Sequence, residues 1–180
     1  MIIRRVVTGL DTKGCSIIVT DGPPSNAYAM RSAPGFAQAV LWSTSALPSI
    51  PVDTDPAPSV KSLHPDVGET RCMMLSLPPD SAMSGPEFDP AAFAREGLEH
   101  SPGIFERMEP DAPGMHRTDT IDYVFVVEGE VWLELDDGLD TRLQAGDVVV
   151  QTGTRHAWRN KSQKSAKLFS VLIGAAQRRP

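Results

Sequence analysis

The sequence has few of the features that mark membrane, nucleic-acid-binding or disulfide-linked proteins. Its two cysteines, Cys15 and Cys72, are too few and too far apart for a disulfide framework, and we expect both to be buried thiols in strands. No apolar run approaches the roughly 18 residues of a membrane helix, and the first residues lack the apolar stretch of a secretory signal. We therefore expect a cytoplasmic protein with no membrane partner.

Basic charge is also scarce, and it is unevenly placed. The formal net charge of −6 argues against a nucleic-acid partner, because such proteins need a basic surface to displace counterions. Residues 80–147 hold 17 of the 23 acidic side chains, whereas the residues after Asp147 include seven basic and no acidic ones. In a single folded unit these two segments are expected to face each other. The alternative is a solvated acidic face with a basic tail.

What the chain does have is enough apolar content for a core and many turn residues. A length of 180 residues with 41% hydrophobic content fits one domain, and 16 Pro with 14 Gly favour short strands over long helices. Alternation and turn residues predict strands over 2–8, 15–20, 39–44, 70–77, 123–127, 131–135, 141–143, 148–151, 157–159 and 167–173. One helix is expected over 90–98, with Asp89 as N-cap and Pro90 in its first turn.

The spacing of the last six strands indicates a closed antiparallel barrel or a jelly roll. We therefore expect an all-β fold with one short helix in a single domain, 1–180. Residues 1–79 would form N-terminal strands and a Pro-rich connection, residues 80–112 a short helix and loop, and residues 113–175 the barrel.

Two histidines and one carboxylate in this strand series carry the strongest chemical signal. His116 and Asp122 have equal parity, so both point to one side if the strand between them is unbroken, and His156 can reach them from a neighbouring strand. Two imidazoles and a carboxylate with open positions suit a divalent metal, non-haem Fe(II) in particular. The alternative is a metal-free site in which the histidines act as acid/base or hydrogen-bonding groups.

These residues stand in two motifs that resemble those of the cupin superfamily. The first runs from His116 through Asp122 to Gly129, and the second from Gly146 through Gly153 and His156 to Asn160. The resemblance implies a double-stranded β-helix, or jelly roll, with a metal on His116, Asp122 and His156. The family's second histidine falls on Thr118, its glutamate on Asp122 and its proline on Gln151, and the second motif is one residue short.

The resemblance also implies a function on small molecules. Similar cupins carry out dioxygenation, decarboxylation, isomerisation and lyase chemistry, often with Fe, Mn, Ni or Zn, and similar single-domain cupins commonly form homodimers through terminal strands. We expect a metal-dependent enzyme acting on a small carboxylate or carbonyl metabolite, with His116 or His156 as the catalytic base if no metal is present. The alternatives are a binding or sensor protein without catalysis, and a vestigial pocket.

Five further residues are candidates for substrate binding. Arg117 and Arg155 each adjoin a motif histidine; they would either face the acidic segment or hold a substrate carboxylate. The polar ends of Tyr123 and Trp158 could touch a ligand, although both also suit a wall or core position. Gln151 completes the set. His100 could swing in as a replacement ligand, and we expect no role for His64.

Overall fold

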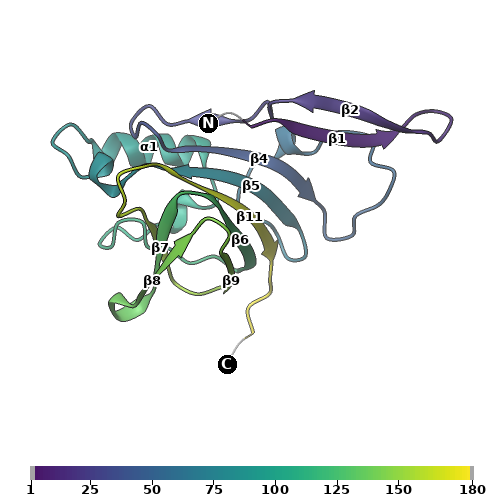
Figure 1. The fold of residues 1–180 in the computed structure, drawn as a ribbon. Helices are drawn as coiled ribbons and strands as arrows, with labels where there is room; N and C mark the ends of the chain where they lie inside the picture. Colours follow the sequence, from purple (N-terminus) through teal and green to yellow (C-terminus); the bar gives the residue numbers. More distant parts are fainter. Residues whose placement is uncertain (1–2, 179–180) are drawn as a thin grey trace.

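A computed structural model describes residues 3–178, and its fold is an all-β jelly roll with one α-helix (Figure 1). The larger antiparallel sheet has the strand order β3-β4-β5-β11-β6-β9, and a smaller sheet has the order β10-β7-β8. The larger sheet consists of β3 (Tyr28–Ala29), β4 (Ala37–Thr44), β5 (Thr70–Leu77), β11 (Ala166–Gly174), β6 (Thr120–Glu128) and β9 (Val148–Thr152). The smaller sheet consists of β10 (Ala157–Arg159), β7 (Glu130–Glu134) and β8 (Asp140–Gln144).

Strand β6 shows how the sequence sets the two faces of the larger sheet. Its residues alternate between buried and exposed up to Val127, as expected when successive side chains point to opposite sides of a strand. Val124 and Val126 point inward and join a core cluster with Val131 of β7 and Leu168 of β11. This cluster fills the space between the two sheets. A second cluster around Val40, Met73 and Leu172 fills the interior next to the first strands of the larger sheet.

A glycine turn joins the two sheets at the end of β6. Gly129 has a φ of +77°, a conformation that side chains rarely adopt, and a Cβ there would lie 3.0 Å from the backbone of Ala166. A side chain at this turn from β6 into β7 would therefore be strained.

Helix α1 (Pro90–His100) begins where the sequence predicts. The Asp89 carboxylate accepts hydrogen bonds from the backbone N–H groups of Ala91 and Ala92, which caps the first turn. Gly97 lets the helix pack closely, since a Cβ there would meet the ring of Phe105 at 1.9 Å. A further contact joins the helix to the loop before β4, where Glu96 accepts hydrogen bonds from Tyr28 and from the backbone of Arg31 and Ser32.

The first two strands form a separate hairpin, which we call the arm. Strands β1 (Arg5–Leu10) and β2 (Ser16–Gly22) pair only with each other, in a two-stranded sheet that extends beyond β4 (Figure 1). The arm thus belongs to neither barrel sheet, whereas the N-terminal strands β4 and β5 are part of the larger sheet. At its base, Arg5 pairs with Asp55 and donates to the carbonyl of Leu41.

The uneven charge has a structural counterpart. Five ion pairs join the acidic segment 80–147 to basic residues after Asp147, which confirms that the two segments face each other. They are Arg155 with Glu109, Arg155 with Asp136, Arg159 with Glu134, Lys161 with Asp140, and Lys167 with Glu128.

Most predicted strands agree with the structure to within three residues at either end, and residue 2 of the first lies outside the described part of the chain. The cysteine prediction needs a correction. Cys72 is half-buried in β5, but Cys15 is exposed in the turn of the arm, because that hairpin has no second layer to cover it. None of the helices among residues 3–178 is long and apolar enough to cross a membrane.

Candidate functional site

The two motif histidines lie side by side in the interior. The backbone N–H of His116 donates to the carbonyl of His156 at 2.9 Å, and the N–H of His156 donates back at 3.0 Å. Their rings are 4.2 Å apart between centroids, and their exposed fractions are only 9% and 2%. Two residues 40 positions apart are therefore held as one antiparallel pair.

Backbone carbonyls fix which ring nitrogen of each histidine carries the proton. Nδ1 of His116 lies 3.0 Å from the carbonyl of Gly114, and Nδ1 of His156 lies 3.0 Å from that of Thr154. A carbonyl only accepts, so each Nδ1 is the donor and each Nε2 keeps its lone pair in the neutral ring. This is the tautomer that a general base needs.

Gln151 is the nearest polar neighbour of His156. Its side-chain nitrogen contacts both ring nitrogens of His156, Nδ1 and, at 2.8 Å, Nε2. With the Nδ1 proton directed at the Thr154 carbonyl, the amide N–H donates to Nε2. Within residues 3–178, the Gly114 carbonyl is the one hydrogen-bond partner found for the ring of His116. The lone pair on Nε2 of His116 is thus the one left for a ligand.

Asp122 and Gln151 face each other across β6 and β9. They are directly paired in the ladder, both are buried, and each has a buried oxygen, Oδ1 of Asp122 and Oε1 of Gln151, without a hydrogen-bond partner in the described chain. Because an unpaired buried acceptor is costly, these two oxygens favour a ligand that donates hydrogen bonds. Both residues were predicted from the sequence to belong to the site, but their direct pairing across β6 and β9 was not predicted.

Burial shifts the protonation of these groups toward their neutral forms. It lowers the pKa of His116, and it lowers that of His156 to about 4, with the nearby His116 adding to the effect. Burial also raises the pKa of Asp122 to about 6. Two neutral imidazoles and a carboxyl group that titrates near neutral pH thus occupy one interior.

The described residues around the histidine pair do not form the predicted three-ligand metal site. Among the described residues, no group of three or more His, Cys, Asp or Glu side chains lies close enough to hold a metal ion. Thr118 is buried and its hydroxyl accepts a hydrogen bond from Thr120. Two imidazoles without a third such ligand do not fit an open site with three protein ligands. The ligand set His116, Asp122 and His156 stays a prediction, and we derive no step through a metal.

The two arginines beside the histidines have different surroundings. Arg155 points to the acidic segment, where its guanidinium lies 2.6 Å from Glu109 and 2.8 Å from Asp136. Arg117 is exposed. Neither arginine is among the buried groups of the site, so their predicted role in holding a substrate gains no support from their position.

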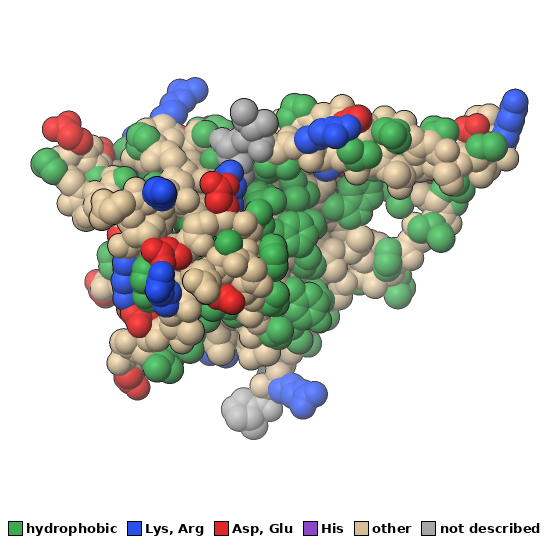
Figure 2. All heavy atoms as spheres, in the orientation of Figure 1, with side chains coloured by type: hydrophobic (Ala, Val, Ile, Leu, Met, Phe, Trp, Pro, Cys, Tyr) green, Lys and Arg blue, Asp and Glu red, His purple; other side chains and the backbone are tan. Residues whose placement is uncertain are grey.

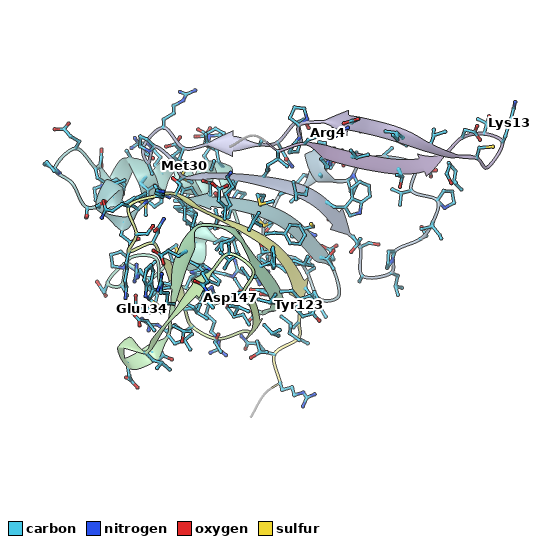
Figure 3. All side chains as sticks on the ribbon, viewed as in Figure 1. Arg4, Lys13, Met30, Tyr123, Glu134 and Asp147 are labelled. Atoms are coloured by element: carbon cyan, nitrogen blue, oxygen red, sulfur yellow. The ribbon has the colours of Figure 1, made fainter. Side chains whose placement is uncertain are left out.

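Of the two aromatic candidates for substrate binding, Trp158 lies near the histidine pair and Tyr123 does not. Trp158 packs against the core, and its ring lies edge-on to that of His156 with the two centroids 6.1 Å apart. Tyr123 lies on the outer face of β6 and is 49% exposed, so it does not line the interior with Asp122 (Figure 3). His100 stacks on Tyr28 at the end of α1, which gives it a structural contact outside the site.

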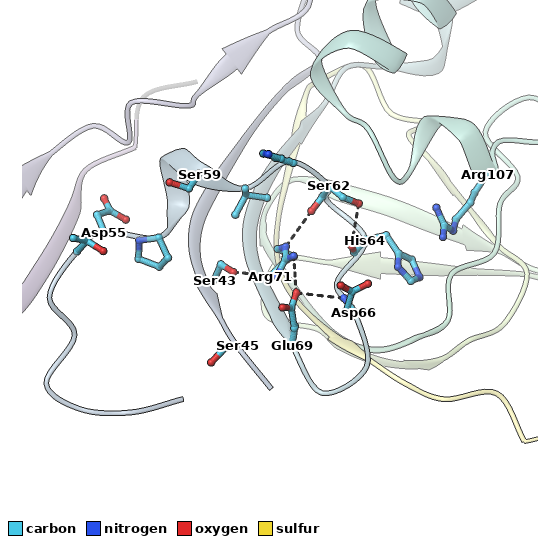
Figure 4. A pocket seen from close by; sticks show the side chains of 14 residues that line it. Ser43, Ser45, Asp55, Ser59, Ser62, His64, Asp66, Glu69, Arg71 and Arg107 are labelled. Atoms are coloured by element: carbon cyan, nitrogen blue, oxygen red, sulfur yellow. Dashed lines mark hydrogen bonds and ion pairs between the residues drawn. The ribbon is translucent and has the colours of Figure 1, made fainter. Parts of the chain in front are cut away.

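A separate polar pocket of about 670 Å³ lies beside the connection before β5 (Figure 4). Its most buried charged group, Arg71, is already bonded to Glu69, Ser43 and two backbone carbonyls. His64 accepts the N–H of Asp119 at 3.1 Å through Nε2. The polar groups of this pocket are thus largely occupied by one another.

The fold and the buried histidine pair define the class: a jelly-roll protein with a polar site between its sheets. Residues 104–172 match the family model described as Cupin domain, so this part of the chain is similar to the cupins.

Curated relatives are similar to part of this chain. Phomopsin biosynthesis cluster protein D of Diaporthe leptostromiformis is 47% identical over 75 residues, which are 36% of this chain and 40% of that protein. The cupin-domain-containing oxidoreductase srdB of Neurospora crassa is 38% identical over 84 residues, 44% of this chain and 43% of the relative. The chain thus spans less than half the length of these relatives.

Solved structures show a more distant likeness. A Cupin 2 conserved barrel domain protein from Salinispora arenicola CNS-205 covers 78% of this chain and 76% of its own, at 16% identity and a TM-score of 0.39.

Proposed function

We propose that this chain is a cupin-type enzyme that transfers a proton on a small carbonyl or carboxylate metabolite, in an isomerase-type or lyase-type reaction. The observation that carries the proposal is the buried histidine pair, in which Nε2 of His116 keeps a free lone pair while Gln151 occupies that of His156. A neutral imidazole held by a carbonyl on its other nitrogen is suited to act as a general base.

Each residue then has a part in the reaction. His116 accepts a proton from the carbon next to the substrate carbonyl, and Asp122, with its raised pKa, gives a proton to the carbonyl oxygen. A base and an acid whose pKa values are shifted by their surroundings form a common acid/base pair. The free oxygens of Asp122 and Gln151 favour a substrate that also carries a hydroxyl group.

The relatives support small-molecule chemistry in general terms. Their names describe oxidoreductases and proteins of biosynthesis clusters. A metal-dependent oxygenase or decarboxylase, which the motifs also allow, would need a third ligand beside the histidine pair. A binding protein without turnover would use the same two free oxygens but would not need the free lone pair of His116.

Deuterium exchange tests the proposal. Protein purified without an affinity tag is incubated in D₂O with hydroxyacetone, dihydroxyacetone and pyruvate, and proton NMR follows loss of the signal next to the carbonyl. We expect the wild type to accelerate exchange for at least one compound, and His116→Asn to lower that rate about 100-fold or more.

The control is His100→Asn, which removes a histidine outside the site and should leave the rate unchanged. Absence of exchange with all three compounds, or a His116→Asn rate equal to that of the wild type, contradicts the proposal. Elemental analysis of the same samples distinguishes a metal-dependent mechanism from the metal-free one. One metal ion per chain in the wild type, lost in His156→Ala, would contradict the metal-free mechanism.

A further inference from the structure

A short loop before the first motif histidine packs on the outer side of the smaller sheet. Loop 109–115 is closed by a backbone hydrogen bond of 2.8 Å between its first and last residues. Ala157 of β10 shares the outward side of its strand with Arg159, yet none of it is exposed, and a Cβ on Gly114 would lie 3.9 Å from its side chain. The loop therefore covers this part of β10.

Two arginines of the second motif hold this loop. Arg155 donates to both carboxylate oxygens of Glu109, at 2.7 and 2.6 Å. Arg159 donates through Nη1 to the backbone carbonyl of Pro113 at 2.7 Å, and a Cβ on the next residue, Gly114, would lie 3.1 Å from that nitrogen. A guanidinium thus binds the loop near each of its ends.

Arg159 differs from the neighbouring arginine on the same side of the smaller sheet. Charged side chains of both signs gather over β7 and β8 (Figure 2), and Arg142 pairs there with Glu130. Arg159 pairs with Glu134 through Nε and also binds the loop through Nη1. Because a guanidinium is rigid and planar, the bond to Glu134 directs the second donor at the loop.

The loop in turn sets the tautomer of His116. The Gly114 carbonyl accepts the Nδ1 proton, so Nε2 keeps its lone pair. Pro113 and Gly114 are the central residues of a turn that is closed by a 2.9 Å bond from the N–H of Met115 to the carbonyl of Ala112. Gly114 has a φ of +81°, as the third residue of a type II turn requires. Movement of this turn would take the Gly114 carbonyl away from the imidazole.

We propose that Arg159 is a positioning residue. By binding the Pro113 carbonyl it keeps the Gly114 carbonyl on Nδ1 of His116, and so keeps the lone pair on Nε2 of that ring. The tautomer can be observed without a substrate, whereas its part in catalysis rests on the proposed function.

Nitrogen-15 NMR of the histidine rings tests the role of Arg159. At about pH 8, above the usual histidine pKa of about 6.5, a neutral ring has one protonated and one bare nitrogen, and the signals of His116 are those lost in His116→Asn. We expect the proton on Nδ1 in the wild type. Arg159→Gln should raise the ratio of the Nε2–H form to the Nδ1–H form about tenfold, because a bond from a charged donor is lost.

A second variant and a matched control accompany it. Glu134→Gln retains Arg159 but removes the carboxylate that directs it, so we expect a smaller shift in the same direction. Arg142→Gln removes an ion pair on the same side of the sheet and should leave the tautomer unchanged. A wild type with the proton on Nε2 overturns the proposal, as do folded Arg159→Gln and Glu134→Gln variants with the wild-type tautomer.

Kinetics of deuterium exchange link the tautomer to the reaction. With a compound whose exchange the wild type accelerates, kcat of Arg159→Gln should fall in proportion to the remaining Nδ1–H population while KM stays the same, because Arg159 acts on the base and not on substrate binding. A raised KM with unchanged kcat overturns the positioning role. A wild type that accelerates no exchange contradicts the proposed function only, since the NMR signals decide the role of Arg159 by themselves.

Discussion

At the scale of single residues, Asp122 and His156 oppose each other in the pH dependence of stability. The pKa of Asp122 is raised from 3.8 to about 6, so its contribution to stability is lost as the pH rises through that range. The pKa of His156 is lowered from 6.5 to about 4, so its contribution grows as the pH rises from 4 to 6.5. The two effects largely cancel between pH 4 and 6.

The variant Asp122→Asn should show the pH dependence that the opposing effects of Asp122 and His156 hide in the wild type. Because it removes only the Asp122 effect, the free energy of unfolding of the variant relative to wild type should rise by about 2 kcal/mol between pH 4 and pH 7. Urea unfolding at both pH values measures the change. Asp137→Asn controls for loss of an exposed carboxylate. A difference that stays constant with pH would mean that Asp122 is not desolvated.

Gln151 shows what residue type alone does not predict. Its position was recognised in the motif, but its bond to His156 depends on the turn between β9 and β10, and its place opposite Asp122 depends on the pairing of β6 with β9. Tyr123 shows the opposite case, because parity with Asp122 already placed it on the other face of the strand. Alternation along β6 was thus the signal that could have excluded it.

At the scale of elements, helix α1 is held to the larger sheet through Glu96. Its carboxylate accepts hydrogen bonds from the hydroxyl of Tyr28 and from the N–H groups of Arg31 and Ser32. Together with a hydrogen bond from the Ser32 hydroxyl, these bonds outweigh desolvation and lower the pKa of Glu96 to about 2. Their stabilising effect is therefore lost as the pH falls from 4.5 toward 2.

Replacing Glu96 should loosen this attachment. Glu96→Gln keeps the size but weakens the accepted bonds, and we expect a loss of about 1 kcal/mol, kept small by solvent access to the carboxylate. Thermal unfolding measured at pH 7 should show the loss, while Glu87→Gln, on the loop before the helix, should not. Equal melting temperatures for both variants would show that Glu96 does not stabilise the attachment of helix α1.

Local signals predicted most element bounds but not their partners. Pro78 and Pro79 end β5 at Leu77, and Asp89 with Pro90 begins α1, because these residues act on the chain next to them. The apolar runs of the arm predict two strands, and nothing within residues 5–22 tells whether a third strand joins them. Pairing between distant strands depends on the whole fold, which is also why Cys15 was misplaced in a buried strand.

At the scale of the whole molecule, the ion pairs between the acidic and basic segments should make stability depend on salt. Arg155 bridges Glu109 and Asp136 and so joins three segments. We expect Arg155→Gln to lower the free energy of unfolding at low salt and to lower it much less in 1 M NaCl, since exposed pairs are screened.

Arg117→Gln is the matched control, because Arg117 also adjoins a motif histidine but is exposed. Chemical unfolding of both variants at 20 mM and 1 M NaCl measures the difference. If Arg155→Gln loses the same free energy at both salt concentrations, the loss comes from packing of the arginine stem and not from charge.

The reciprocal backbone bonds between His116 and His156 constrain how this site can adapt. Neither backbone can shift past the other without breaking two hydrogen bonds, so the two histidine positions are fixed relative to each other. A change of substrate during evolution would then require substitutions at neighbouring positions, such as 118, 122 and 151, while the paired backbones of His116 and His156 stay in place.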